Sequence, residues 1–392
     1  MDFLNVQRSR TNDEGFKTVT SQEQIIVENS IESIFRIYAE KIEIDPDAPV
    51  LLAAEHIDYL TKSLTHLPST YICLDASRTW MCYWICHSLN LMKHQLPDQL
   101  KTNVFKFLER CQSPQGGFGG GPGQAPHLAS TYAAVNALCC LNSEEALRII
   151  NRETLLNFLW STKCKSGAFC LEVDGEVDIR GAYCAASVAS LINLKTDKLF
   201  QNTAEWIVAC QTYEGGFSGC PGMEAHGGYT FCGVAALTLL NSMHLCDMKA
   251  LLRWCVNKQT SFEGGFQGRT NKLVDGCYSF WQGAVFSVMY ANFNLLEDEQ
   301  AISKHLFSHR ALQEYILICC QHPSGGLLDK PGKPRDVYHS CYTLSGLSVS
   351  QHLPSSEVDV VGQKSNLLMP VHPLYNLVHN CVKFAMQFFR NA

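Results

Sequence analysis

The stretch QTYEGGFSG, residues 211–219, recurs along the chain and decides how the chain folds. Four related copies also place a small-residue turn before Phe or Leu: QSPQGGFGG (112–120), KSGAFCL (165–171), SFEGGFQG (261–268) and QHPSGGLLD (321–329). From copy to copy, the Phe or Leu recurs after 51, 48, 49 and 61 residues. A period of this length is typical of a protein built from stacked structural repeats.

A second piece follows each copy and is rich in small and apolar residues. Its copies are HLASTYAAVNALCCL (127–141), DIRGAYCAASVASL (178–191), AHGGYTFCGVAAL (225–237), VDGCYSFWQGAVFSV (274–288), VYHSCYTLSGL (337–347) and a divergent LDASRTWMCYWICHSL (74–89). Segments that are apolar nearly all round predict helices buried on all sides. The more polar stretches between them, such as 143–163 and 202–212, predict outer helices with one solvated face. Since such helix pairs bury their faces only by stacking, we predict a closed ring of about six inner helices inside about six outer ones.

The repeats also suggest how the chain is divided. We expect residues 1–70 to form a helical N-terminal arm outside the repeat period and residues 71–350 to form one toroidal domain that contains the repeats. Residues 351–392 read as a polar loop followed by a final helix near 374–390, packed on the same domain.

Composition excludes several classes of protein. The chain has 392 residues, 46% of them apolar, and a net charge of −6, which offers no general footprint for nucleic acid or an anionic membrane. No apolar run approaches the roughly 20 residues that a membrane span requires, so we expect no stable membrane insertion. The odd number of cysteines, 19, does not read as a disulfide framework. We therefore expect a cytoplasmic protein with mostly reduced, buried thiols.

Polar residues recur in one register of the inner helices. Three residues before an aligned tyrosine, these helices carry Arg180, His226, Asp275 and His339. One such residue alone is explained by a helix cap or a satisfied buried side chain. Four at equivalent places in a ring would converge near one mouth of its cavity, where unpaired polar groups cost several kcal/mol. The shared register therefore favours a functional site.

Two of these residues belong to a candidate metal site. Asp275 and Cys277 flank Gly276 at the start of a predicted helix, where non-helical backbone lets both side chains point toward one place. With His339 they supply one oxygen, one sulfur and one nitrogen ligand. Three protein ligands of these types with a vacant fourth position are typical of catalytic zinc.

The remaining candidates form a charged rim beside an aromatic wall. The rim comprises His226, Arg269, Lys272 and Tyr278, and the wall comprises Trp80, Trp84, Tyr183, Tyr229, Phe231 and Trp281. Cations at helix starts are a favourable seat for a diphosphate. Taken singly, each rim residue could instead be an ordinary solvated surface residue, and each wall residue could simply fill the core. Together they suit an amphiphile with an apolar tail and a phosphorylated head.

Over roughly residues 70–350 the chain resembles the β subunits of the CaaX protein prenyltransferases, and the farnesyl-transferring branch in particular. The motifs that carry this resemblance are LDASRTWMCYW, GEVDIRGAYCAAS, GMEAHGGYTFCG, GRTNKLVDGCYSFW and LLDKPGKPRDVYHSCY. The resemblance implies an α/α toroid that pairs with an α subunit and holds one zinc ion. It also implies transfer of a farnesyl group from farnesyl diphosphate to the cysteine of proteins ending in CaaX.

The resemblance also assigns roles to residues. The zinc ligands match Asp275, Cys277 and His339, with Tyr278 beside them in the catalytic set; Asp329 falls where the farnesyl branch carries a carboxylate linked to magnesium. Diphosphate binders match His226, Gly227, Gly228, Tyr229, Arg269, Lys272 and Tyr278. The isoprenoid wall matches Trp80, Arg180, Tyr183, Tyr229, Cys232 and Trp281. The peptide surface matches Trp80, Trp84, His127, Arg180 and Tyr338.

Three other functions compete with this reading. The nearest is a type I geranylgeranyltransferase β subunit, although the bulk of Trp80 and Tyr342 favours a fifteen-carbon over a twenty-carbon chain. A terpene cyclase-like enzyme would share the Gln- and Gly-rich repeats, but the chain has no Asp-x-Asp-Asp acid. A non-catalytic helical repeat scaffold would leave the shared polar register unexplained.

Overall fold

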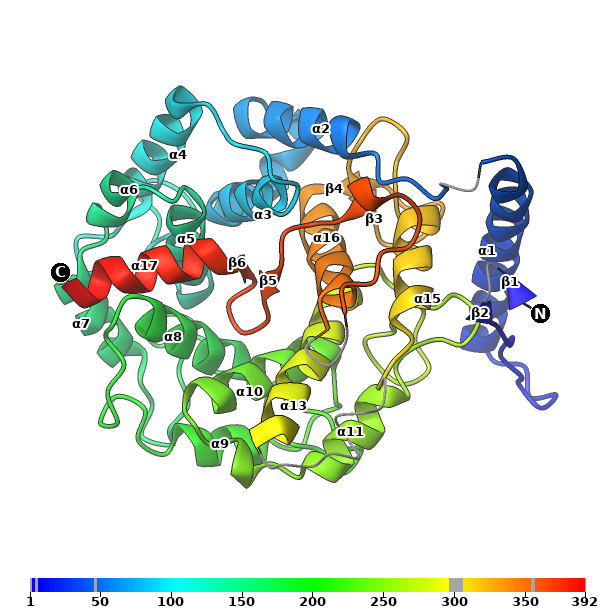
Figure 1. Cartoon of the computed structure of the whole chain (residues 1–392). Helices are drawn as coiled ribbons and strands as arrows, with labels where there is room; N and C mark the ends of the chain where they lie inside the picture. Colours follow the sequence, from blue (N-terminus) through cyan, green and yellow to red (C-terminus); the bar gives the residue numbers. More distant parts are fainter. Residues whose placement is uncertain (1, 4–5, 46–47, 296–305, 354–356, 392) are drawn as a thin grey trace.

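Two concentric rings of helices make up most of the structure (Figure 1). It is a computed structural model that describes residues 2–3, 6–45, 48–295, 306–353 and 357–391. The inner ring contains α3 (Arg78–Leu91), α5 (Leu128–Cys140), α8 (Ile179–Leu191), α10 (Gly227–Leu239), the pair α12 (Tyr278–Trp281) and α13 (Gly283–Leu295), and α16 (Val337–Gln351). The outer ring contains α2 (Ala53–Thr65), α4 (Asp98–Cys111), α6 (Glu144–Arg148), α7 (Arg152–Thr162), α9 (Thr203–Ala209), α11 (Met248–Val256) and α15 (His309–Glu314).

In the part of the chain that the structure describes, the remaining elements are short, apart from two helices that lie outside the rings. These two are α1 (Val19–Ile44) and α17 (His379–Asn391). A π-helical turn, η3 (Tyr315–Cys319), continues α15, and 3-10 turns are η1 (Ser69–Ser77), η2 (Met243–Leu245) and η4 (Lys364–Asn366). Three two-stranded antiparallel pairs are β1 (Asp2–Phe3) with β2 (Val6–Gln7), β3 (Leu327–Leu328) with β4 (Arg335–Asp336), and β5 (Val371–His372) with β6 (Leu377–Val378). The predicted all-α toroid is confirmed.

The inner helices are buried because their sequences leave no polar face. In α5 every residue except Ala129 is buried, and Asn136 donates its amide to the Tyr375 carbonyl oxygen at 3.0 Å. The outer helix α11 instead buries one side, through Leu251, Trp254 and Cys255. This difference follows the apolar and amphipathic patterns of the two kinds of segment. None of the helices in the described residues combines the length and apolar character required to cross a bilayer.

The Gly-Gly-Phe loops fasten each outer helix to the previous repeat. Gly215 has φ +111°, and a Cβ there would lie 2.1 Å from the Ala250 carbonyl oxygen in α11. Beside it, the Gln211 side chain accepts from the Asp247 N–H at 3.0 Å and donates to the Asp247 carbonyl at 3.0 Å. Glycine is required because only a residue without a side chain fits this positive φ and close approach. The equivalent contacts are Gly116 with Thr154, Gly167 with Asn202, Gly264 with Ala311, and Gly325 with Glu55.

The last of these contacts closes the ring. Gln321 accepts from the Leu52 N–H at 2.8 Å, at the N-cap of α2, as Gln211 does for α11. The helix α2 therefore occupies the sixth outer position, although no Gly-Gly-Phe loop precedes it in the sequence. Residues 53–65, which form α2, belong to the segment 1–70 that we expected to lie outside the repeat period as an N-terminal arm.

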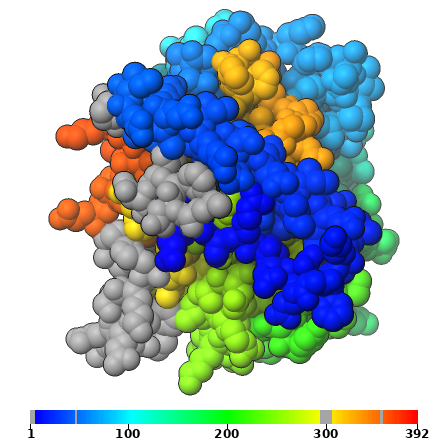
Figure 2. Space-filling model, turned by 90° about the vertical axis from the view of Figure 1, so that its right-hand side faces the viewer, coloured from blue at the N-terminus to red at the C-terminus, as the bar shows by residue number. Residues whose placement is uncertain are grey.

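The N-terminal arm lies across the outer helices, where Figure 2 shows it as a broad dark blue band. The Arg8 side chain is buried, donates to the Phe262 carbonyl oxygen at 2.8 Å and forms an ion pair with Glu314. Ile31 and Phe35 of α1 pack in the same apolar cluster as Phe262. These contacts anchor the arm to the loop that leads toward Asp275.

The C-terminal hairpin contacts residues of the central cavity. Tyr132 donates to the Tyr375 carbonyl oxygen at 3.1 Å, and Tyr183 donates to the Leu374 carbonyl oxygen at 2.9 Å. These carbonyls belong to the turn between β5 and β6, so the final helix begins at His379 rather than near residue 374. The hairpin therefore lies against two of the tyrosines that line the cavity.

The ring-closing contact gives a stability prediction. We expect Gly325→Ala to lower the free energy of unfolding by about 2–4 kcal/mol, because its φ is +81° and its Cβ would lie 2.0 Å from the Glu55 carbonyl oxygen. Gly332→Ala is the matched control, with φ +82° but nothing within 4 Å of its Cβ, and is expected to cost about 1–2 kcal/mol. Urea unfolding measures both losses. Equal losses would contradict the proposed role of the contact with α2.

Candidate active site

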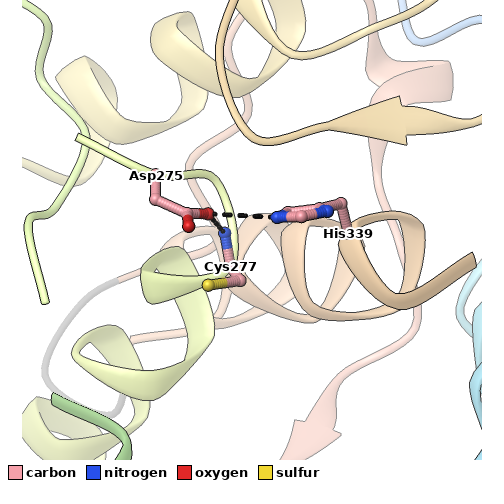
Figure 3. A group of neighbouring side chains, drawn as sticks. All are labelled: Asp275, Cys277 and His339. Atoms are coloured by element: carbon pink, nitrogen blue, oxygen red, sulfur yellow. Dashed lines mark hydrogen bonds and ion pairs between the residues drawn. The ribbon is translucent and has the colours of Figure 1, made fainter. Parts of the chain in front are cut away.

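A group of three potential metal ligands lies at the start of α12 and α16. One ligand atom from each of Asp275, Cys277 and His339 lies within 4.8 Å of the other two. Figure 3 shows the Asp275 carboxylate facing the His339 ring, with Oδ1 and Nε2 3.4 Å apart, and Cys277 beside the carboxylate. Among the described residues, no second group of at least three His, Cys, Asp or Glu side chains meets so closely.

The backbone around Gly276 brings the first two ligands together. Asp275 Oδ1 accepts from the Cys277 N–H at 2.8 Å, which folds the carboxylate back over the helix start. The Gly276 N–H donates to the Asp329 carbonyl at 2.7 Å, and a Cβ on Gly276 would lie 2.9 Å from the Leu328 carbonyl oxygen. A larger residue would therefore push the ligand loop away from β3.

Asp336 orients the third ligand. As the N-cap of α16 it accepts from the His339 N–H at 2.7 Å, and its second oxygen lies 2.6 Å from His339 Nδ1. This hydrogen bond leaves His339 Nε2 free to face Asp275. A carboxylate on the far nitrogen of a metal-binding histidine is a common arrangement that fixes the ring and increases its basicity.

Electrostatics at the group favour a bound cation. Burial lowers the pKa of His339, but the carboxylates of Asp275 and Asp336 outweigh it and raise this pKa to about 10. Burial, and then Asp275, raise the pKa of the Cys277 thiol well above its usual value. A metal ion must therefore displace protons from both side chains. One carboxylate, one thiol and one imidazole fit zinc, and leave a coordination position for a further ligand.

A cavity of about 420 Å³ opens beside this group. Its lining includes many of the predicted site residues: Trp80, Trp84, Arg180, Tyr183, His226, Gly228, Tyr229, Cys232, Tyr278, Trp281 and Tyr338. Trp281 Nε1 donates to Tyr338 Oη at 3.2 Å, and the Trp281 and Tyr342 rings stack with centroids 4.3 Å apart. The cavity is thus apolar along most of its wall, with polar groups gathered at its mouth.

Sequence reasoning missed a member of the wall, Tyr132, which contacts Trp80 and Tyr183 with ring centroids 5.6 and 5.4 Å away. Tyr132 stands five residues after its N-cap, His127, as Tyr183 does after Asp178. The repeat alignment therefore contained the signal. Ser77, Ala129 and Cys184 also line the cavity without having been predicted, and nothing in their residue types distinguishes them.

His226 and Tyr278 form a hydrogen bond at the cavity mouth, and its donor can be assigned. His226 Nδ1 accepts from the Gly228 N–H at 3.0 Å, so the proton of the neutral ring lies on Nε2. That Nε2–H faces Tyr278 Oη at 2.9 Å, which leaves the tyrosine O–H free to donate to another group. Burial, and then Arg269, lower the pKa of His226 to about 4, so this neutral form is present at pH 7.

Several predicted residues lie outside the cavity lining. Arg269 is partly exposed and pairs with Glu224 at 3.0 Å, whereas Lys272 is exposed and borders a separate groove beneath the N-terminal arm. The carboxylate of Asp329 lies 2.6 Å from Lys330 Nζ. Phe231 and Gly227 are buried in α10, and His127 caps α5 two residues before Ala129.

The Asp336 carboxylate, which orients His339, gives a prediction. We expect Asp336→Asn to weaken zinc binding by about 10–100-fold, because the amide replaces the charged acceptor on His339 Nδ1. Since asparagine is also a good N-cap, stability should change little. Asp178→Asn at the N-cap of α8 is the matched control and should leave zinc affinity unchanged. Competition with a metallochromic chelator measures both; equal affinity in the two variants would contradict the role of Asp336.

Comparison with known proteins agrees with this geometry. A family model described as the prenyltransferase alpha-alpha toroid domain matches residues 51–377. The chain is 41% identical to protein farnesyltransferase subunit beta of Arabidopsis thaliana, over 96% of this chain and 90% of that protein. It is 40% identical to the Saccharomyces cerevisiae protein of the same name, over 92% and 85%. The solved Candida albicans protein geranylgeranyltransferase-I superposes with a TM-score of 0.74 at 25% identity, over 87% of this chain and all of that one.

The double ring and the ligand group at its mouth define a prenyltransferase of the α/α-toroid class. Within that class, the sequence identity of 40–41% to farnesyltransferase β subunits, over most of both chains, decides which family this chain belongs to. The chain belongs to the family of protein farnesyltransferase β subunits. The resemblance carried by the sequence motifs is confirmed.

Proposed function

We propose that this chain, paired with an α subunit, transfers a farnesyl group from farnesyl diphosphate to the cysteine of proteins ending in CaaX. The observation that carries the proposal is the meeting of Asp275, Cys277 and His339 within 4.8 Å at the edge of an aromatic cavity. In the reaction a C–S bond forms at C1 of the prenyl chain, the C1–O bond breaks, and diphosphate leaves.

The ligand group is assigned to the substrate thiol. A zinc ion held by Asp275, Cys277 and His339 would lower the pKa of that thiol from about 8.5, so that thiolate is available at neutral pH. Tyr338, whose ring centroid lies 5.0 Å from that of His339, and Trp84 form the adjoining wall. We assign this wall to the C-terminal residues of the protein substrate, together with His127 and Arg180.

The opposite side of the mouth is assigned to the diphosphate. Negative charge grows on the leaving group as the C1–O bond stretches, and the Tyr278 O–H, oriented by His226, can donate to it. His226 is the N-cap of α10, and the backbone of Gly227 and Gly228 and the side chain of Tyr229 follow it in the first turn of that helix. The N-terminus of a helix favours anions. We also assign Arg269 and Lys272 of the neighbouring loop to the diphosphate. This assignment requires Arg269 to turn from Glu224 and Lys272 to turn from the groove that it borders.

The cavity wall is assigned to the isoprenoid. Tyr183, Cys232 and Trp281 line the cavity, and their apolar surfaces suit an isoprenoid chain. Trp80 packs on Tyr132, so the wall is bulky where a longer chain would have to extend. This bulk is our reason for preferring a fifteen-carbon to a twenty-carbon substrate.

Two further assignments concern magnesium and location. Lys330 Nζ lies 2.6 Å from each carboxylate oxygen of Asp329, so magnesium there would depend on diphosphate oxygens for its other ligands. All 19 cysteines are unpaired, which is typical of proteins in a reducing compartment and supports the cytoplasm as the place of action.

Prenyl preference tests the proposal. The chain is co-expressed with an α subunit and assayed with a labelled CaaX peptide and either farnesyl or geranylgeranyl diphosphate. We expect kcat/KM to be at least about tenfold higher for farnesyl diphosphate, because the bulky wall rejects extra carbons. A reversed preference would identify a geranylgeranyltransferase, and binding of the α subunit without transfer or zinc would favour a scaffold.

A further inference from the structure

Two thiols that the proposed reaction does not use lie close together in the second repeat loop. Cys164 Sγ and Cys170 Sγ are 3.4 Å apart, and both side chains are partly exposed. A disulfide bond is about 2.05 Å long, so the sulfurs must approach by roughly 1.4 Å. Rotation about the side-chain bonds of two partly exposed residues can supply such a movement.

The backbone around the pair is a short hairpin. The Cys164 N–H donates to the Ala168 carbonyl at 2.9 Å, and the Cys170 N–H donates to the Thr162 carbonyl at 2.8 Å. The loop between the two cysteines is therefore held closed before any S–S bond forms. A covalent link across so short a loop removes little entropy from the unfolded chain, which argues against a mainly structural purpose.

The same hairpin occurs in the other repeats with different side chains. The same two N–H to carbonyl bonds recur in each loop, on either side of a bridge such as Lys163 with Phe169. The residues at the positions of Cys164 and Cys170 are Ser113 and Gly119, Thr212 and Ser218, Thr260 and Gln267, and His322 and Leu328. Among the five Gly-rich loops, only the second carries cysteine at both positions. The pair is thus a feature of this loop and is not required by the hairpin itself.

The surroundings make the two thiols unequal. Burial, and then Cys164, raise the pKa of the Cys170 thiol to about 11. Lys163 lies beside Cys164, and its ammonium donates to the Gly167 carbonyl at 2.9 Å within the same hairpin. The raised pKa makes Cys170 the less ready nucleophile, so Cys164 reacts first, and Cys170 is placed to attack it in a second step.

We propose that Cys164 and Cys170 are a redox-active dithiol that forms an intramolecular disulfide by exchange with a small-molecule disulfide such as oxidised glutathione. The Cys164 thiolate attacks one sulfur of the reagent, whose S–S bond breaks and releases one glutathione thiolate. Cys170, after losing its proton to solvent, attacks Cys164 Sγ and releases the second glutathione. The protein loses two thiol protons and two electrons, and the reagent is reduced to two thiols. This inference depends on the hairpin geometry and not on the proposed transferase activity.

The test follows the disulfide directly. The full-length chain, co-expressed with an α subunit, is equilibrated in buffers of fixed reduced and oxidised glutathione, quenched in acid, alkylated and digested for mass spectrometry. We expect a peptide pair linked through Cys164 and Cys170, half-formed where [GSH]²/[GSSG] is on the order of millimolar or above, and lost on reduction with dithiothreitol.

Variants sharpen the result. Cys164→Ser and Cys170→Ser should each abolish the linked peptide and leave the remaining cysteine as a mixed disulfide with glutathione. Cys220→Ser, which removes another partly exposed thiol, should retain the link. The proposal is overturned if wild-type Cys164 and Cys170 are both alkylated at every glutathione ratio. It is equally overturned if they persist as two separate glutathione adducts, or if they link to other cysteines.

Discussion

Replacing Cys277 by alanine is expected to reduce bound zinc from about one ion per chain to near zero and to slow farnesyl transfer by more than about 10²-fold. The thiolate is one of three ligands, and loss of a direct ligand should cost more than the 10–100-fold typical of an outer hydrogen-bond partner. The Asp275 carboxylate and His339 ring would remain paired with each other at 3.4 Å. Elemental analysis and a transfer assay, both with the α subunit present, measure the two effects.

Cys341→Ala is the matched control for this variant. Cys341 is also a buried cysteine, two residues after His339 in the same helix, but its thiol is not part of the ligand group. We expect it to keep its zinc and its activity, apart from the modest loss of stability that follows a smaller buried side chain. Unchanged zinc content in Cys277→Ala would remove Cys277 from the ligand set, and absence of zinc from the wild type would remove the site.

The fold was predictable because its information is local and repeated. Each Gly-rich loop places a glycine against the backbone of the next outer helix, and the same residues recur about every fifty positions. A closed ring was predicted, but the helix that closes it, α2, could not be identified in this way. Gln321 meets Leu52 across 269 residues, and α2 has no Gly-rich loop before it to announce its role. The C-terminal hairpin was missed for the same reason, since its carbonyls are held by the distant Tyr132 and Tyr183.

The residues of the candidate site also differ in how far the sequence could predict their positions. Asp275 and Cys277 are fixed by one local turn around Gly276, and the repeat register relates them to His339. The sequence alone therefore predicted that these three side chains would meet. Lys272 has no such register. It lies on a loop whose position depends on contacts with the N-terminal arm, and its side chain borders that groove rather than the cavity. Residues on irregular loops therefore remain the least predictable part of the site, and their roles stay predictions.

The hydrogen bond between His226 and Tyr278 at the cavity mouth gives the second prediction with a large expected effect. We expect Tyr278→Phe to slow a single turnover by about 10²-fold while changing the Kd for farnesyl diphosphate much less. The lost O–H would donate most strongly to the charge that develops on the departing diphosphate, so the transition state loses more than the ground state. Rapid-quench measurement of transfer with enzyme in excess gives the rate, and equilibrium binding of the diphosphate gives the Kd.

The pH dependence of this loss distinguishes a neutral hydrogen-bond donor from a titrating one. His226 has a pKa of about 4 and is neutral above it, while burial raises the pKa of Tyr278 so that its proton is retained at neutral pH. The ratio of wild-type to variant rates should therefore be constant from about pH 6 to 8. Tyr213→Phe, at a side chain that is 94% exposed, controls for substitution itself and should leave the rate unchanged. A ratio that falls toward one at either end of this range would mean that the Tyr278 hydroxyl is not the donor to the leaving group, because neither partner titrates there.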